Sequence, residues 1–144
     1  MPRVLLRPIV SADLPVLFEH QRDPLASEMA AFPPRERDAF MSHWERILAD
    51  PDVRVRAVVA DGRLAGNVVS FVRGGRREVG YWLGREFWGA GVATAALAAF
   101  LDLETERPLY AGAARWNAGS LRVLEKCGFA ACGEEGDLLP VRLD

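Results

Sequence analysis

The stretch that decides the fold is residues 79–97, which read VGYWLGREFWGAGVATAAL. A strand-like run ends near Leu83, a short loop with three glycines follows, and an alanine-rich helix begins at about residue 92. Amide N–H groups in the first turn of a helix lack internal partners, and the helix dipole is positive there. Glycines let a large anion approach the backbone closely. The unit is therefore a candidate pyrophosphate site, with Thr94 as an added hydroxyl donor.

The glycines alone do not identify the anion. A P-loop needs a lysine after its glycines, and none follows here. A Rossmann fingerprint needs GxGxxG, whereas residues 89–94 (GAGVAT) contain only its first half. Residues 109–111 (LYA) stand where that fold requires an acidic residue. On this evidence a phosphate site and a purely structural turn are equally supported.

Working outward, the pattern predicts an α+β fold with one sheet. Three strand-like runs, the last of which leads into the glycine loop, are separated by Asp-Gly and Gly-Gly turns that favour an antiparallel meander. A helix–strand–helix pattern follows, and residues 23–33 read as a loop or a broken helix. We expect strands at residues 3–10, 53–60, 64–72, 77–83, 108–114, 129–132 and 138–143, and helices at residues 12–22, 35–49, 92–104 and 117–127.

The composition is that of an ordinary globular protein. Of the 144 residues 50% are apolar and 26% are charged, and the net charge is −2, which gives no reason to expect nucleic-acid or membrane partners. No apolar run approaches the ~18 residues of a membrane span, and the N-terminus does not have the pattern of a signal peptide. We therefore expect a single cytoplasmic domain over residues 1–144.

The cysteines and histidines do not indicate a metal site. The chain has two of each, Cys127 and Cys132 with His20 and His43, and no close grouping combines them. We expect two small buried thiols, two surface or hydrogen-bonded histidines, and no metal.

A second segment, NAGSLRVLEKCGF at residues 117–129, indicates a known protein family. Together with EVGYW at 78–82 and WGAGVAT at 88–94, it resembles the GNAT superfamily of acetyl-CoA-dependent N-acetyltransferases. The closest resemblance is to the branch of ribosomal-protein N-terminal acetyltransferases, whose opening strand and helix are similar to LRPIVSADLPVL at 6–17. The resemblance covers nearly the whole chain. It implies a GNAT-like fold, with one mixed, mostly antiparallel, twisted sheet flanked by about four helices.

The resemblance also implies that acetyl-CoA is the co-substrate. Trp88 stands where the wider superfamily has Gln or Arg at the start of its pyrophosphate loop, as is usual in this branch. Leu83 falls on the strand that pairs with the pantetheine arm, and its amide could polarise the thioester carbonyl. Asn117 is expected to cap the last helix and to lie near the cofactor. The implied cofactor-binding residues are Leu83, Trp88, Gly89, Ala90, Gly91, Val92, Ala93, Thr94 and Asn117.

Acetyl transfer requires the amine to lose a proton and the departing thiolate to gain one. Glu78, on the strand leading into the loop, is the candidate base, acting through a water; the alternative is a surface carboxylate paired with Arg76 or Arg77. Ser120 is the candidate acid, because Leu124 occupies the position of the family's usual tyrosine. The alternative for Ser120 is a capping role alone.

In this family the first two helices and their loop hold the acceptor. Met29, Phe32 and Trp44 are therefore candidate acceptor-binding residues, although ordinary core packing is the stronger interpretation for Trp44. The expected function is transfer of an acetyl group to a small amine or to a peptide or protein N-terminus, by direct attack in a ternary complex. The alternatives are a non-catalytic acyl-CoA-binding module or regulator, and a structural protein whose loop is merely a turn. Dimers are common in the family, and no sequence feature decides whether this chain forms one.

Overall fold

The computed structural model describes residues 2–144 and has a seven-stranded sheet and five α-helices. The strands are β1 (Val4–Arg7), β2 (Arg54–Ala60), β3 (Arg63–Arg73), β4 (Arg76–Leu83), β5 (Leu109–Ala114), β6 (Ala130–Ala131) and β7 (Leu138–Leu143). The helices are α1 (Leu14–Gln21), α2 (Pro24–Ala30), α3 (Arg37–Ala49), α4 (Val92–Leu101) and α5 (Ala118–Lys126), with 3-10 turns η1 (Ser11–Asp13) and η2 (Arg85–Phe87).

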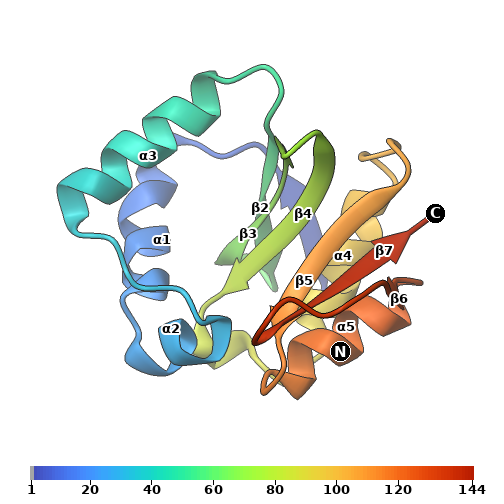
Figure 1. Cartoon of the computed structure of the whole chain (residues 1–144). Helices are drawn as coiled ribbons and strands as arrows, with labels where there is room; N and C mark the ends of the chain where they lie inside the picture. The colour runs from blue at the N-terminus through green and yellow to red at the C-terminus, as the bar shows by residue number, and fades with distance from the viewer. Residues whose placement is uncertain (1) are drawn as a thin grey trace.

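The sheet has the strand order β1-β2-β3-β4-β5-β7-β6 and is the mixed, mostly antiparallel sheet that the family resemblance implies. All adjacent strands pair antiparallel except β4 and β5, which are parallel. Figure 1 shows these two strands side by side at the middle of the sheet, with β4 leading down into the loop before α4. The parallel pair therefore divides the sheet into an N-terminal and a C-terminal part.

One helix more than expected is present. Helix α2 occupies residues that the sequence leaves as a loop or a broken helix. Asp23 caps it by accepting a hydrogen bond from the amide of Leu25 at 3.1 Å, and Pro24 occupies its first turn, where a missing N–H costs nothing. At seven residues the helix is too short for hydrophobic periodicity to reveal it.

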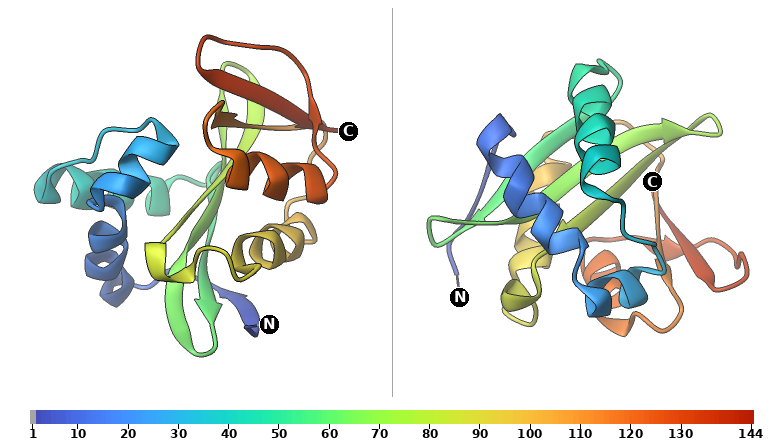
Figure 2. Two further views of the ribbon diagram at one scale, coloured as in Figure 1. Left: turned by 90° about the horizontal axis from the view of Figure 1, so that it is seen from below. Right: turned by 90° about the vertical axis from the view of Figure 1, so that its left-hand side faces the viewer.

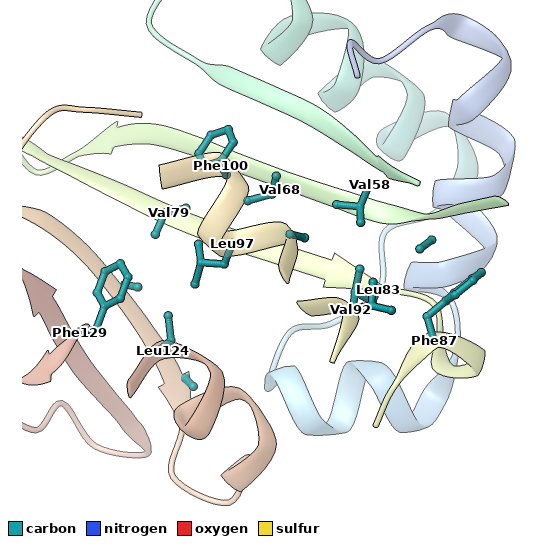
Figure 3. Packing of buried hydrophobic residues seen from close by; sticks show 14 of the residues in the cluster. Val58, Val68, Val79, Leu83, Phe87, Val92, Leu97, Phe100, Leu124 and Phe129 are labelled. Atoms are coloured by element: carbon teal, nitrogen blue, oxygen red, sulfur yellow. The ribbon is translucent and has the colours of Figure 1, made fainter. Parts of the chain in front are cut away.

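Helices cover both faces of the sheet, α1–α3 on one and α4 and α5 on the other (Figure 2). Figure 3 shows Leu97 and Phe100 of α4 packed toward Val58, Val68 and Val79 of the sheet, in the larger of two buried clusters. The smaller cluster joins α1 and α3 to the opposite face and contains Phe18, Phe40, Trp44 and Val55. Trp44 lies in this cluster and is only 6% exposed, so the structure places it in the core.

Strands β4 and β5 meet at one end and part at the other. Their register within the described chain contains a single residue pair, Glu78 with Tyr110. Beyond that pair, residues 79–83 of β4 pair only with β3. Apart from the carbonyl of Leu83, which accepts a hydrogen bond from the Trp88 indole, the backbone groups along that edge are free for another partner, because edge N–H and C=O groups of a strand are otherwise unpaired.

A bulge in β3 supports the end of β4. The register passes from Val58 opposite Gly66 to Val59 opposite Leu64, so Ala65 is an extra residue in β3. The carbonyl of Ala65 accepts a hydrogen bond from the amide of Gly84 at 2.9 Å, which anchors the residue that follows β4.

Candidate functional site

The opening between β4 and β5 forms a cleft of about 540 Å³. Residues of α2, β4, the β4–α4 loop, the first turn of α4, β5 and α5 line it. The size falls within the range of about 300–1,000 Å³ that is typical of small-molecule sites. We call this feature the β4–β5 cleft.

The glycine loop and the start of α4 form one end of the cleft. Gly91 is the N-cap of α4 and has a φ of +79°, a left-handed conformation that favours glycine. The helix begins at Val92, as predicted, and its first-turn amides have no partner within the helix. Five predicted cofactor residues line the cleft here: Gly89, Gly91, Val92, Ala93 and Thr94. Ala90 is exposed and is not among the lining residues.

Trp88 has a structural role in the loop, although its residue type departs from the superfamily pattern. Its indole N–H donates a hydrogen bond to the carbonyl of Leu83 at 3.1 Å. The bond closes the loop back onto the last residue of β4, and both residues line the cleft. At this position the tryptophan can thus shape the loop without contributing a charge.

Two further contacts fasten this end of the cleft to the N-terminal helices. Arg85 forms an ion pair through two hydrogen bonds with Asp23, the N-cap of α2. The indole N–H of Trp82 donates to the carbonyl of His20 in α1 at 3.2 Å. The loop is therefore held by Asp23 at the start of α2, and the end of β4 is held by α1.

The β5–α5 turn lies across the cleft from the glycine loop, because the parallel strands β4 and β5 end on the same side of the sheet. Asn117 caps α5, as predicted, by accepting a hydrogen bond from the amide of Ser120 at 3.1 Å. Its side-chain amide donates to the carbonyl of Met29 at 3.3 Å, and the indole of Trp116 donates to the carbonyl of Glu28 at 3.0 Å. Asn117 and Met29 both line the cleft, so this connection bridges the β5 side to α2.

Glu78 lies beside the cleft but is not among its lining residues. Its carboxylate accepts two hydrogen bonds from Arg73, at 2.9 and 2.8 Å, and the side chain is 18% exposed. The partner is Arg73, and not Arg76 or Arg77 as the alternative interpretation expected. The hairpin register explains the choice, because Arg73 lies diagonally across from Glu78 on the same face. Arg76 instead lies over the ring of Tyr110, and Arg77 is buried on the opposite face.

Ser120 lines the cleft and contacts a residue that the sequence reasoning missed. The hydroxyl oxygens of Ser120 and Tyr81 lie 2.7 Å apart, and Tyr81 also lines the cleft. Burial raises the pKa of the Tyr81 phenol above its ordinary value, although its hydrogen bond to Ser120 opposes the rise. Strand alternation could have located this phenol, because it places Tyr81 on the sheet face opposite to Glu78.

Two cations on α5 were also missed. Arg122 and Lys126 line the cleft and are exposed, and neither forms an ion pair with another described residue. Their i,i+4 spacing places them on one face of the helix, and this is the signal that could have found them.

The other predicted residues divide between the cleft and its surroundings. Met29 lines the cleft. Phe32 packs edge-on against Trp82, with ring centroids 6.3 Å apart, and is 42% exposed. His20 differs from the expected surface or satisfied histidine, because its Nδ1 is buried without a hydrogen-bond partner. Burial lowers the pKa of His20 and favours its neutral form.

The structure gives two further findings on classes of site. Among residues 2–144, no three His, Cys, Asp or Glu side chains gather closely enough to hold a metal ion. None of the helices in that part of the chain has both the length and the hydrophobicity needed to span a membrane.

A mixed sheet that opens between two parallel strands, with a glycine loop and a helix N-terminus at the opening, is the arrangement expected of a GNAT acetyltransferase. Residues 3–130 match the family model described as an acetyltransferase (GNAT) domain. The chain therefore belongs to the GNAT acetyltransferase family, as the motifs predict.

A named relative agrees with this family. The chain is 34% identical to YdaF of Bacillus subtilis (strain 168), provisionally named a ribosomal N-acetyltransferase, over 115 residues that cover 73% of this chain. The chain spans only 61% of the length of YdaF.

Solved structures share the fold. An acetyltransferase from Agrobacterium tumefaciens str. C58 is 20% identical with a TM-score of 0.81, covering 99% of this chain and 91% of that one. A spermidine N-acetyltransferase from Vibrio cholerae, solved with CoA and spermine, is 18% identical with a TM-score of 0.81, covering 96% of this chain and 92% of that one.

Proposed function

We propose that this protein transfers the acetyl group of acetyl-CoA to a primary amine, either a small amine or a peptide or protein N-terminus. The amine attacks the thioester directly while both substrates are bound. The observation that carries the proposal is the β4–β5 cleft, where a glycine-capped helix N-terminus, an unpaired strand edge and a pair of hydroxyl groups line one cavity.

The cleft has a group to bind each part of acetyl-CoA that the reaction needs held. The amide N–H groups of residues 92–94 and of the glycine loop can donate hydrogen bonds to a pyrophosphate, and the cations Arg122 and Lys126 can neutralise its charge and that of a further phosphate. The free edge of β4 can pair with the amides of a pantetheine arm. The amide of Leu83, at the end of that edge, is a donor for the thioester oxygen and stabilises the oxyanion of the tetrahedral intermediate.

We assign the role of base to Glu78. Glu78 lies two residues from Gly80, which lines the cleft, and this is a distance of about 7 Å along the strand. A Cβ atom on Gly80 would meet nothing within 4 Å, so open space lies in front of β4 here. A carboxylate that accepts two bonds from Arg73 retains lone pairs for a water, which can take the proton of the amine. The proton returned to the thiolate comes from the Ser120 side of the cleft.

A second candidate function is a non-catalytic acyl-CoA-binding module. The favouring observation is that Arg73 already holds the Glu78 carboxylate and that Glu78 does not line the cleft. Such a protein would bind the cofactor and release no CoA when amines are added.

Calorimetric titration of the purified protein tests the cofactor assignment. We expect acetyl-CoA and free CoA to bind, and ATP and NAD not to bind at the same concentrations. The affinity should fall as salt is added, because salt screens Arg122 and Lys126 from the phosphates. Absence of binding to a folded protein would contradict the proposal. An amine screen that follows release of the CoA thiol then separates the enzyme from the binding module.

Replacing Glu78 with Gln should lower kcat by about 100-fold, because loss of a general base typically costs 10²–10⁴-fold in rate. The affinity for acetyl-CoA should change by less than about twofold, since Glu78 does not line the cleft. The loss should be greatest near neutral pH, where the amine most needs a base. Arg76→Gln at the same end of β4 is the control, because Arg76 contacts Tyr110 and not Glu78. An unaltered rate and pH profile in the Glu78 variant would exclude the residue as the base.

A further inference from the structure

The contact between Tyr81 and Ser120 joins two elements that are distant in the sequence. Tyr81 comes from β4 and Ser120 from the first turn of α5, and their hydroxyl oxygens lie 2.7 Å apart. Both side chains line the β4–β5 cleft. The amide N–H of Ser120 donates to Asn117 at 3.1 Å, so the cap of α5 holds the backbone from which the Ser120 hydroxyl reaches Tyr81.

The position of the family's usual tyrosine on this helix holds Leu124, which is 3% exposed and carries no proton donor. A phenol nevertheless reaches the same cleft from the opposite wall, on Tyr81. The aliphatic hydroxyl of Ser120 alone is too weak an acid to protonate a thiolate efficiently. A phenol is a better donor, because its ordinary pKa of about 10 is close to the value of about 8.5 for a thiol.

We propose that Tyr81 is the proton source for the departing thiolate and that Ser120 relays the proton. This inference rests on the proposed function. As the amine nitrogen bonds to the carbonyl carbon and the C–S bond breaks, the sulfur takes the hydrogen of Ser120 Oγ. In the same step Ser120 Oγ takes the hydrogen of the Tyr81 hydroxyl. The tyrosinate regains a proton from solvent when the products leave.

The hydrogen-bonding capacity of the two hydroxyl groups permits this direction of transfer. If Tyr81 donates to Ser120, the hydrogen of Ser120 is free to point into the cleft, since a hydroxyl has one donor and two acceptor sites. Burial raises the pKa of Tyr81, so the phenol holds its proton at neutral pH and regains it readily from solvent after the transfer. Burial also raises the pKa of the Cys127 thiol, which therefore stays neutral beside the pair.

The first test needs no acceptor. Free CoA is bound to the wild type and to Tyr81→Phe, and its thiol is titrated by the ultraviolet absorbance of the thiolate. A hydroxyl that donates to the sulfur stabilises the thiolate and lowers the pKa of the thiol. We expect the bound thiol to titrate about half a unit or more higher in Tyr81→Phe, and at least as much higher in Ser120→Ala. Calorimetry should find CoA affinities within about twofold of the wild type.

The other tyrosine of the chain provides the matched control. Tyr110 lies on β5, stacks under Arg76 and does not line the cleft. Tyr110→Phe removes a hydroxyl of the same kind and should leave the titration of the bound thiol unchanged.

The second test uses turnover with an amine acceptor. Tyr81→Phe, Ser120→Ala and the double variant should each lower kcat by a similar factor of about 10–100, with the KM for acetyl-CoA unchanged, because members of one relay are not additive. If the two residues had independent structural roles, the factors by which they lower kcat would multiply in the double variant.

The outcomes separate the relay from the proposed function. An identical thiol titration in the wild type and Tyr81→Phe, or additive losses of kcat, would overturn the relay and leave the transferase intact. A shifted titration without amine-dependent CoA release would show that the hydroxyl pair donates to the sulfur of bound CoA, and would overturn the proposed function together with the relay. Lack of CoA binding by the folded wild type would overturn both.

Discussion

Gly91→Val is expected to weaken acetyl-CoA binding by about 100-fold or more, a loss of roughly 2.8 kcal/mol in binding free energy. Gly91 caps α4 with a φ of +79°, a conformation that costs a residue with a Cβ atom about 1–2 kcal/mol and is a genuine outlier for a β-branched one. Relief of that strain would rotate the amides of the first turn of α4 away from the cleft. A side chain at this position would also stand between the backbone and a phosphate. Calorimetric titration with acetyl-CoA measures the effect.

The turn between β3 and β4 offers a matched control for backbone strain. Gly75 has a φ of +78°, and a Cβ atom there would meet nothing within 4 Å. Gly75→Val should lose a similar amount of stability on chemical denaturation and retain its affinity for acetyl-CoA, because Gly75 does not line the cleft. Gly91→Asn separates strain from obstruction, since Asn tolerates the left-handed region but still places a side chain in the anion's path. Wild-type affinity in Gly91→Val would exclude the glycine loop as the pyrophosphate site.

The parts of the site that lie within one local segment could be predicted from the sequence. The strand, glycine loop and helix of residues 76–101 appear in the structure with α4 starting at Val92. Asn117 caps α5 as its residue type and position suggest. These features depend on backbone conformation and on hydrogen bonds between residues near one another in the chain, which residue type strongly constrains.

The features that depend on contacts between distant segments could not be predicted in this way. The partner of Glu78 is set by the register of the β3–β4 hairpin, and the contact of Tyr81 with Ser120 spans 39 positions in the chain. Helix α2 is recognisable only through its cap and its contacts with the β5–α5 turn. The bulge at Ala65 reverses the faces of the residues beyond it, which simple alternation along β3 does not anticipate.

Gly66→Ala is expected to lower the free energy of unfolding by about 3 kcal/mol or more, as overpacking against unyielding neighbours does. A Cβ atom at Gly66 would lie 2.0 Å from the carbonyl oxygen of Trp82 and 2.9 Å from the Cα of Leu83. Both atoms belong to the backbone of β4, so no side-chain rotation can relieve the contact. Chemical denaturation followed by circular dichroism measures the change.

Gly80→Ala is the matched control, because Gly80 is in the neighbouring strand and a Cβ atom there would meet nothing within 4 Å. Its stability should change by less than about 1 kcal/mol.

If Gly66→Ala is purified folded, β4 must have moved away from β3 at Trp82 and Leu83, where the cleft begins. Its affinity for acetyl-CoA should therefore fall together with its stability, whereas the loss of affinity in Gly91→Val should exceed its loss of stability. A Gly66→Ala protein as stable as Gly80→Ala would show that β3 and β4 are not in close contact at the bulge. The inference that β3 supports the cleft would then be wrong.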